Sequence, residues 1–341
     1  MEDIPFVRNA WYAAAWSEEI GREFVERWIC GVPIVFYRRE DGTAVALEGT
    51  CPHRQYPLAL GRLKGDNVEC GYHGITFGCD GACARVPGEQ RAPAAMRVRA
   101  FPLHERGGLI WLYAGDPGKA DPAQIKEQWL AAPGWTSVHG TKILEGRAQL
   151  LIENLMDLSH EAFLHPETIG NSSVAETPIV TEVEPDCVRA TRLMKNIAPP
   201  ALFAKFGVSA RIDRTQIAEF HPPSMVLTRA KAASTEPGYP TLNFVVIHCV
   251  TPETETRTRY NWAVARDYAL DDRAVSEGWQ KGSSAIFDQD VAALGAQEAR
   301  VQRLPPEHIE LSIPGDAAAL AARKLVKQLA ANERRGAVPA G

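Results

Sequence analysis

The sequence predicts an α+β protein with two domains, and three observations lead to this prediction. Residues up to about 117 alternate short strand-like runs with turn residues, which is typical of an all-β domain. A Pro/Gly/Asp-rich connection, DPGKADPAQ at 116–124, follows. Beyond it, strand-like runs are followed by two long helical stretches. We therefore expect one domain at 1–117 and a second at 118–341.

Two segments define the first domain most clearly. The run IVFYRREDGTAVALEG at 34–49 predicts a hairpin, because an Asp-Gly pair at 41–42 is favoured in tight turns between strands. The run GLIWLYAG at 108–115 predicts the strand that closes the domain.

The second domain reads as a set of strands enclosed by helices. Its first segment, TKILEGRAQLLIENLMDLSHEAFLH at 141–165, passes from alternating residues into a helix. Strand-like runs follow near 188–194, 224–230, 242–250 and 258–266. Apolar residues at helical spacing then predict helices at 273–301 and 316–335.

Composition excludes several classes of protein. With 341 residues, 45% hydrophobic and 23% charged, the chain has an ordinary globular balance. It contains no apolar run approaching about 18 residues, and its start, MEDIPFVRN, is acidic, so we expect neither a membrane span nor a signal peptide. A net charge of −5 gives no support for nucleic-acid binding. Seven cysteines without a secretion signal favour the reducing cytoplasm over a disulfide scaffold.

Two cysteine–histidine pairs stand in the stretch CPHRQYPLALGRLKGDNVECGYHG at 51–74. Cys51 and His53 form the first pair, and Cys70 and His73 form the second after sixteen intervening residues. Two thiolates and two imidazoles can hold tetrahedral zinc, but a Rieske [2Fe–2S] cluster uses the same ligand set. Turn-forming Pro and Gly residues follow each pair, which suits two hairpin tips around a flat cluster and favours the cluster.

A second group of chemistry-bearing residues lies in NLMDLSHEAFLHP at 154–166, which reads as an amphipathic helix. Asp157 and His160 are three residues apart and would lie on one side of it. His165 lies about 140° further around, so a straight helix would point it elsewhere. Because Pro166 disfavours the α conformation in the residue before it, we expect the helix to end or bend there. Both imidazoles can then converge, although the same pattern also fits exposed polar residues.

Together the two motifs resemble those of the Rieske non-heme iron oxygenases, in which C-x-H and C-x-x-H bind the cluster and N-x-x-D-x-x-H-x-x-x-x-H serves a mononuclear iron. The segments NAWYAAAW at 9–16 and TPETET at 251–256 are similar to the vanillate O-demethylase branch of that family. The resemblance implies an N-terminal all-β Rieske domain and a C-terminal catalytic domain of helix-grip (START-like) fold.

The resemblance also implies two cofactors and their ligands. A Rieske [2Fe–2S] cluster would be held by Cys51, His53, Cys70 and His73, and a mononuclear Fe(II) by His160, His165 and one carboxylate. The candidates for this carboxylate are Asp288 and Asp290, which lie about 200° apart on the predicted helix, so only one can face the metal. Spacing alone does not choose between them. In the family a Gln often follows the ligand acid by seven positions, and since Gln297 matches Asp290, we expect Asp290 with Asp288 in reserve.

Two further residues of the iron motif acquire roles through the resemblance. Asp157 would link His160 to the cluster ligand His73 of a neighbouring subunit, in a head-to-tail homotrimer. A carboxylate on a ligating imidazole is physically reasonable, because it sets the tautomer and orientation of the ring. Asn154 matches a position near the iron.

The implied activity is that of the terminal oxygenase component of a Rieske monooxygenase. We expect it to act with O2 on a small aromatic substrate, methoxylated and acidic, by O-demethylation or hydroxylation. The sequence has no GxGxxG after a strand and no other flavin or nicotinamide signature, so electrons are expected from a separate NAD(P)H-dependent reductase, with or without a ferredoxin. His248 is expected at the substrate pocket, where it could bind an anion such as a carboxylate or sulfonate, and a core histidine is an equally good interpretation. Trp279 and Ile286 are also expected to line the pocket, and core packing is at least as good an interpretation of both.

Two alternative functions remain at this point. Arene cis-dihydroxylation uses the same metal centres, but those enzymes usually have longer large subunits and a small β-subunit partner. A non-enzymatic Rieske electron carrier would lack the mononuclear iron.

Overall fold

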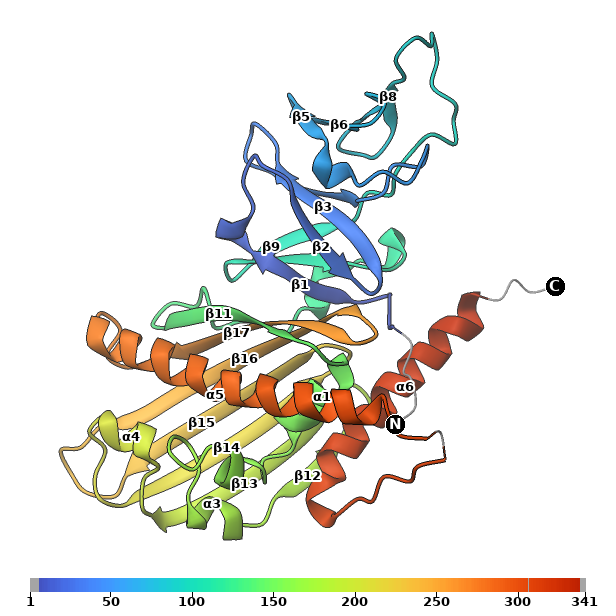
Figure 1. Ribbon diagram of the computed structural model, residues 1–341. Helices are drawn as coiled ribbons and strands as arrows, with labels where there is room; N and C mark the ends of the chain where they lie inside the picture. The colour runs from blue at the N-terminus through green and yellow to red at the C-terminus, as the bar shows by residue number, and fades with distance from the viewer. Residues whose placement is uncertain (1–5, 306, 338–341) are drawn as a thin grey trace. The chain divides into compact units, whose positions relative to one another are not determined.

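The structure is a computed structural model that describes residues 6–305 and 307–337, and these form two compact units (Figure 1). The N-terminal unit contains Arg8–Ile125 together with Pro252–Thr254. The C-terminal unit contains the rest of the described chain, which is mainly Lys126–Thr251 and the residues from Glu255 onward. The boundary at 117/118 remains a proposal.

The N-terminal unit is built from three small antiparallel sheets. The first has the order β1-β10-β9, formed by Trp11–Trp16, Leu109–Tyr113 and Leu103–Arg106. The second has the order β2-β3-β4, formed by Val25–Ile29, Val32–Arg38 and Ala44–Glu48. The third has the order β5-β6-β7-β8, formed by Arg62–Lys64, Asn67–Glu69, Thr76–Phe77 and Cys83–Arg85. The connections carry 3-10 helices at Ser17–Glu19, Leu58–Leu60, Pro117–Lys119 and Pro122–Gln124.

Both strand predictions for this unit are confirmed. Strands β3 and β4 pair antiparallel around the Asp-Gly turn, and β10 occupies the predicted closing run. The core of the unit is apolar and includes the thiols of Cys51 and Cys70 among Val35, Leu58 and Phe77. The hydrophobic core therefore holds in place the two loops that carry the Cys–His pairs.

The C-terminal unit contains a seven-stranded antiparallel sheet in the order β11-β17-β16-β15-β14-β13-β12. In chain order the strands are Thr136–Leu144, Val180–Val183, Val188–Ile197, Ile212–His221, Met225–Ser234, Thr241–Thr254 and Arg257–Arg266. The helices are α1 Ala148–Met156, α2 Glu161–Leu164, α3 Ser172–Glu176, α4 Ala201–Lys205, α5 Arg273–Val301 and α6 Ala317–Ala337, with a 3-10 turn at Pro314–Asp316. The predicted α+β class is confirmed.

The four predicted strands correspond to β13, β15, β16 and β17, whereas β12 and β14 were missed. Strand β14 is the more informative of the two. Its inward positions alternate as expected of a strand, but two of them are Arg214 and Gln216. These polar residues interrupt the apolar alternation from which a half-buried strand is recognised.

The prediction of one helix through 154–165 is wrong. Helix α1 ends at Met156, and Asp157 has an extended backbone with φ −92° and ψ 94°. The side chain of Asp157 accepts hydrogen bonds from the backbone N–H and the hydroxyl of Ser159, a local turn that competes with helix continuation. The predicted helix is therefore interrupted before His160, and its second part, α2, ends at Leu164 with His165 outside the α conformation, as expected before Pro166.

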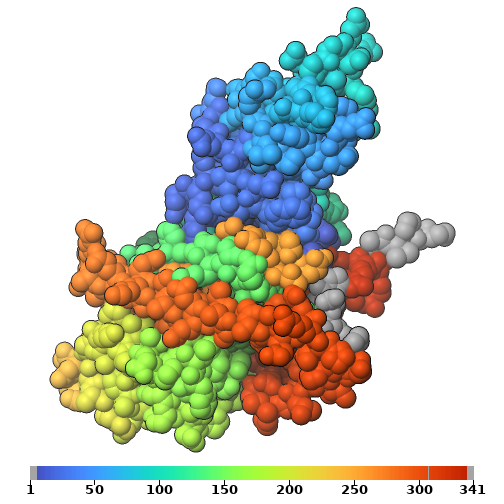
Figure 2. Space-filling model, in the orientation of Figure 1, coloured from blue at the N-terminus to red at the C-terminus, as the bar shows by residue number. Residues whose placement is uncertain are grey.

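Helix α5 crosses one face of the sheet (Figures 1 and 2), and one stripe of its side chains is buried. The buried residues recur at helical spacing: Trp279, Ser283, Ile286, Phe287, Asp290, Leu294 and Glu298. The rings of Phe287 and Trp262 pack with centroids 5.0 Å apart, which anchors the helix over β17. Asp290 is thus held on the inner side of α5 by its apolar neighbours. No helix in the described ranges is long and apolar enough to cross a membrane.

A buried ion pair joins α5 to the start of α1. Glu298, 1% exposed, accepts two bonds from the Arg147 guanidinium at 2.7 and 2.8 Å. Since α1 leads into the histidine segment and α5 carries Asp290, this pair sets the distance between the two parts of the site.

We predict that Glu298→Ala lowers stability by about 3 kcal/mol, because it leaves the Arg147 charge without its buried partner. Calorimetry would record this as a fall in melting temperature of about 6–12 °C. Glu277→Ala is the matched control, because it removes an exposed carboxylate from the same helix, where the pair with Arg273 contributes about 0.5 kcal/mol or less. Equal melting temperatures for the two variants would contradict the role given to the buried pair.

Candidate metal centres and substrate cavity

The two Cys–His loops have the same backbone hydrogen-bond pattern. In each loop the cysteine N–H donates to the carbonyl five residues on, and the cysteine carbonyl accepts from the N–H four residues on, at 2.8–3.0 Å. That fourth residue is Gln55 in one loop and Gly74 in the other, with φ of +53° and +69°. The left-handed conformation is easy for glycine and costs Gln55 about 1 kcal/mol or more. Such a conformation in both loops indicates that the paired turn geometry is required.

The four side chains of these loops fit a Rieske cluster. Cys51 and Cys70 are 2% and 1% exposed, and the rings of His53 and His73 have centroids 4.6 Å apart. Burial raises the pKa of the Cys51 thiol, so a thiolate there needs a cation beside it. The Nδ1 atom of His53 is buried and has no hydrogen-bond partner among the described residues. Two thiols beside two imidazoles, one with an unused nitrogen, match the donor set of a [2Fe–2S] Rieske centre.

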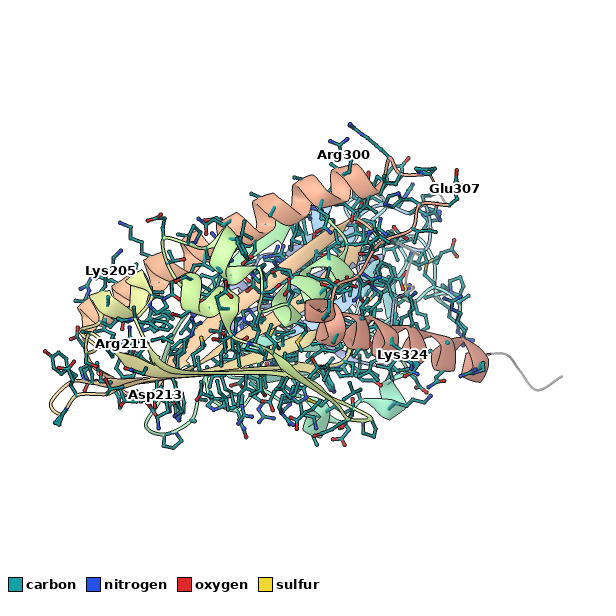
Figure 3. All side chains as sticks on the ribbon, turned by 90° about the horizontal axis from the view of Figure 1, so that it is seen from below. Lys205, Arg211, Asp213, Arg300, Glu307 and Lys324 are labelled. Carbon is teal, nitrogen blue, oxygen red and sulfur yellow. The ribbon has the colours of Figure 1, made fainter. Side chains whose placement is uncertain are left out.

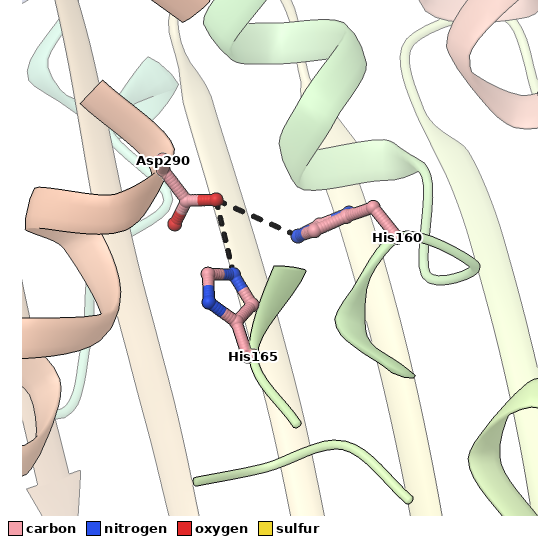
Figure 4. A group of neighbouring side chains, drawn as sticks. All are labelled: His160, His165 and Asp290. Atoms are coloured by element: carbon pink, nitrogen blue, oxygen red, sulfur yellow. Dashed lines mark hydrogen bonds and ion pairs between the residues drawn. The ribbon is translucent and has the colours of Figure 1, made fainter. Parts of the chain in front are cut away.

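In the C-terminal unit, His160, His165 and Asp290 converge on one point (Figure 4). Oδ1 of Asp290 lies 3.6 Å from His160 Nε2 and 3.1 Å from His165 Nε2. The three possible ligand atoms all lie within 4.8 Å of one another. Asp290 and His165 are buried, whereas the His160 side chain is 21% exposed, so the group is open on one side.

Both imidazoles are oriented by bonds to their other nitrogen. His160 Nδ1 donates to the backbone carbonyl of Asp157 at 2.5 Å, and His165 Nδ1 donates to Oε1 of Gln289 at 2.7 Å. Each Nε2 therefore faces the Asp290 carboxylate, where it is able to bind a proton or a metal. Burial by itself lowers the pKa of His165, but Asp290 and Gln289 outweigh it and raise that pKa. The electrostatics favour a positive charge at the centre, and two His with one carboxylate are the ligand set of non-heme Fe(II) sites with open positions.

The structure distinguishes the two candidate carboxylates. Asp288 lies on the outer side of α5 with its side chain 63% exposed, and it pairs with Lys142 at 2.6 Å. Asp290 is 4% exposed and faces both histidines. Only Asp290 is placed to complete the group.

Asp157 contacts His160 in a different way from the sequence expectation. Its backbone carbonyl accepts from the imidazole, while Oδ1 of its carboxylate accepts from Ser159. Asn154 lies one turn earlier on α1, beside a cavity that His160, His165 and Asp290 also border. Its buried Oδ1 has no hydrogen-bond partner among the described residues. Sequence reasoning missed Gln289, although its place directly before Asp290 was an available signal.

A cavity adjoins His160, His165 and Asp290, and its wall is mainly apolar. The predicted residues His248, Trp279 and Ile286 all border it. Trp279 packs on Phe244 in this wall, with ring centroids 4.5 Å apart. The cavity is therefore suited to a flat aromatic ring.

His248 lies in the cavity wall as a neutral ring. Its Nδ1 is 2.5 Å from the Tyr260 hydroxyl, and its Nε2 is 3.3 Å from Oγ1 of Thr228. Complete burial lowers the pKa of His248 to about 3. It therefore offers no positive charge to a substrate anion. The sequence analysis also missed three polar residues of the wall, Glu161, Arg214 and Gln216.

We predict that Asp290→Ala and His160→Ala each reduce iron from about three to about two atoms per chain, with acid-labile sulfide unchanged at about two. The remaining two irons belong to the cluster, which the substitutions do not touch. Asp288→Ala is the matched control two residues away and should keep all three. Metal analysis of anaerobically purified protein makes the measurement, and a loss of iron in Asp288→Ala instead of Asp290→Ala would reverse the assignment.

Both parts of the chain match known families. Residues 10–102 match the Rieske [2Fe-2S] domain, and residues 144–332 match the vanillate O-demethylase oxygenase C-terminal domain. The vanillate O-demethylase oxygenase subunit of Pseudomonas sp. (strain HR199 / DSM 7063) is 34% identical over 345 residues, covering 97% of each chain. The toluene-4-sulfonate monooxygenase system iron-sulfur subunit of Comamonas testosteroni is 33% identical over 353 residues, covering 98% of this chain and all of the relative.

Among solved structures, dicamba monooxygenase bound to 3,6-dichlorosalicylic acid superposes with a TM-score of 0.89 at 30% identity, covering 96% of this chain and 99% of the other. A second crystal structure of that enzyme contains non-heme iron and dicamba. These matches confirm the predicted fold class and the two predicted cofactors, and they remove the zinc interpretation of the Cys–His pairs. Together with the paired Cys–His loops and the convergent histidines and carboxylate, they show that the chain belongs to the vanillate O-demethylase oxygenase family of Rieske non-heme iron monooxygenases.

Proposed function

We propose that this protein is a terminal oxygenase that removes the methyl group from a small, methoxylated and acidic aromatic substrate. The observation that carries the proposal is the open group of His160, His165 and Asp290 at one side of an apolar, aromatic-lined cavity. Such a cavity places an aromatic substrate next to the ligand positions that the protein leaves free. Two relatives are named for vanillate, an aromatic carboxylate, and for toluene-4-sulfonate, an aromatic sulfonate. These names support an acidic substrate.

Each ligand would have a defined part in holding the metals. Cys51 and Cys70 would bind one iron of the cluster, and His53 and His73 the other. His160, His165 and Asp290 would bind the mononuclear iron. When bound, the cluster and the iron supply the activation of O2 and the stepwise delivery of electrons.

The protein's own residues control the geometry of this site. Gln289 and the Asp157 carbonyl hold the two imidazoles with Nε2 inward, which orients both rings for a metal. Trp279, Ile286 and the neutral ring of His248 would enclose the arene and limit the entry of water. Asn154 would act from the edge of the same cavity as a polar contact near the metal.

The overall reaction consumes O2, NAD(P)H and a proton. One oxygen atom enters the methoxy carbon and the other leaves as water. The hydroxylated methoxy group is a hemiacetal, which breaks down to a phenol and formaldehyde. Ring or methyl hydroxylation has the same requirement for O2 and electrons and differs in its product.

The two alternatives have less support. The similarity to enzymes named O-demethylases over nearly the whole chain favours demethylation over arene cis-dihydroxylation. The convergent histidines and carboxylate are unnecessary in a non-enzymatic electron carrier, since the cluster alone would serve that purpose.

We also propose a head-to-tail homotrimer in which Asp157 receives a hydrogen bond from His73 of the next subunit. The Asp157 carboxylate uses Oδ1 for Ser159, and its Oδ2 has no partner among the described residues. This oxygen is therefore able to accept from an imidazole N–H of another chain.

Electrons would reach the assembly from a separate NAD(P)H-dependent reductase, with or without a ferredoxin. The dependence on cytosolic NAD(P)H and the seven free cysteines support a cytoplasmic location.

With a suitable reductase and NAD(P)H, the holoenzyme should convert methoxybenzoates to hydroxybenzoates with one formaldehyde per O2 consumed. The measurement combines an oxygen electrode with chromatography of the aromatic product and a formaldehyde assay. A cis-diol without formaldehyde would overturn the proposal in favour of dihydroxylation. Oxidised reductase with no aromatic product from any methoxyarene would favour the electron carrier.

Asp157→Ala should keep about three irons per chain yet lower turnover by about 100-fold or more, because the proposed contact between cluster and iron site is lost. Light scattering should give the mass of three chains for the wild-type protein. A monomeric protein with full turnover, or an Asp157→Ala variant with wild-type turnover, would contradict the assignment.

A further inference from the structure

A cluster of buried charged and polar side chains from α2, β13 and β14 lies beside the substrate cavity. It consists of Glu161, Arg192, Arg214 and Gln216, which are 5%, 1%, 3% and 3% exposed. Three of them, Glu161, Arg214 and Gln216, border the cavity. Charges are rarely buried to this extent unless they are paired, so the balance of this cluster is informative.

The cluster contains two guanidinium groups and one carboxylate. Oε2 of Glu161 lies 3.3 Å from Nη2 of Arg214 and 3.7 Å from Nη2 of Arg192. Within the described part of the chain, neither arginine has another carboxylate at ion-pair distance. Burial lowers the pKa of both arginines and the Glu161 carboxylate partly offsets this, but arginine remains protonated in proteins. Arg192 also interacts with the charge of Asp157, whereas Glu161 is the one carboxylate that acts on Arg214.

Both arginines have a buried Nε–H without an acceptor among the described residues, but only Arg214 borders the cavity and is able to receive an anion there. Arg192 lies outside the cavity lining and donates to the backbone carbonyls of Val174 and Leu158. Arg214 donates Nη1 to the Ile169 carbonyl at 2.9 Å and Nη2 to Glu161 and Gln216, both at 3.3 Å. Its Nε–H is buried and has no acceptor among the described residues. An unmade bond on a buried charged donor costs free energy that a ligand acceptor would recover.

The direction of Arg214 follows from its place in β14. Its neighbour Asp213 lies at the periphery of the molecule, where it accepts from Lys195 at 2.8 Å (Figure 3). Successive side chains of a strand point to opposite faces, so Arg214 points inward, where its guanidinium lies over the Phe203 ring at 5.0 Å. Phe203 borders the same cavity, and the cation is thus presented beside an aromatic surface.

We propose that Arg214 binds the negatively charged group of the aromatic substrate, a carboxylate or a sulfonate, and so selects acidic arenes over neutral ones. The inference rests on the proposed function in assuming an aromatic substrate in this cavity, and it adds the residue that recognises the acid. Gln216 positions Arg214: its Oε1 accepts from Nη2 of Arg214, and its Nε2 donates to Glu161. The neutral His248 is not the source of the counter-charge.

The test compares two probes of nearly equal shape, 4-methoxybenzoate and neutral 4-methoxybenzamide, by calorimetric titration of the anaerobic, oxidised holoenzyme. Wild-type protein should bind the benzoate at least about 10-fold more tightly. Arg214→Gln should weaken benzoate binding about 30-fold or more and change benzamide binding less than about 3-fold. Arg214→Lys keeps the charge without the planar fork and should retain part of the preference.

Arg229→Gln is the matched control, because it removes an arginine of the adjacent strand that is 44% exposed and paired with Glu219. It should leave the affinity for both probes unchanged. Equal affinity of wild-type protein for the two probes would overturn the inference, whether or not any Arg214 variant folds. So would an Arg214→Gln protein that loses both affinities and mononuclear iron together, since Arg214 would then only support α2.

Formaldehyde release separates this inference from the proposed function. If the preference for benzoate depends on Arg214 but no methoxyarene yields formaldehyde, the demethylase proposal fails, and the proposal that Arg214 binds the acidic group (the anion site) stands. If benzoate and benzamide are demethylated with equal efficiency, the anion site fails and the demethylase proposal stands.

Discussion

The convergence of two imidazoles and one carboxylate, from His160, His165 and Asp290, is the constraint on which the catalytic unit depends. His165 and Asp290 are 125 residues apart in the chain, yet their side chains meet at 3.1 Å. Without a cation at the centre, the buried Asp290 carboxylate has the two imidazoles to balance its charge, and it raises the pKa of His165. The protein maintains this arrangement because the other nitrogen of each imidazole is already bonded, to the Asp157 carbonyl and to Gln289. The site is thus organised for a metal before the metal binds.

Several features of the fold follow from that requirement. The chain leaves the α1 helix at Asp157, which frees the backbone carbonyl that His160 needs. Helix α5 keeps Asp290 within a mainly apolar stripe, where the packing of large side chains holds the helix on the sheet. The Arg147–Glu298 pair then fixes α5 against the beginning of α1. Each of these contacts controls the position of a ligand without being a ligand itself.

The cavity beside the metal group combines an aromatic, uncharged region with one charged wall. Trp279 and the neutral His248 belong to the first, and the Arg214 cluster to the second. A methoxyarene that carries an acid has the same division between an apolar ring and a charged end. The two regions lie on different elements, helix α5 and strand β14, so substrate class could change through β14 while the metal site stays intact.

The sequence by itself determined the parts of this protein whose chemistry is local. Each Cys–His pair lies within one short turn, so spacing and turn residues were enough to indicate a cluster, and the α5 bounds followed from helical spacing over 273–301. Only the tertiary structure decided between Asp288 and Asp290, because both are acids on one helix and the choice depends on which side of α5 packs on the sheet. It also revealed the break at Asp157 and strand β14, where side-chain hydrogen bonds and inward polar residues override the local pattern. Burial and pairing between distant segments are properties of the folded chain, and no local pattern encodes them.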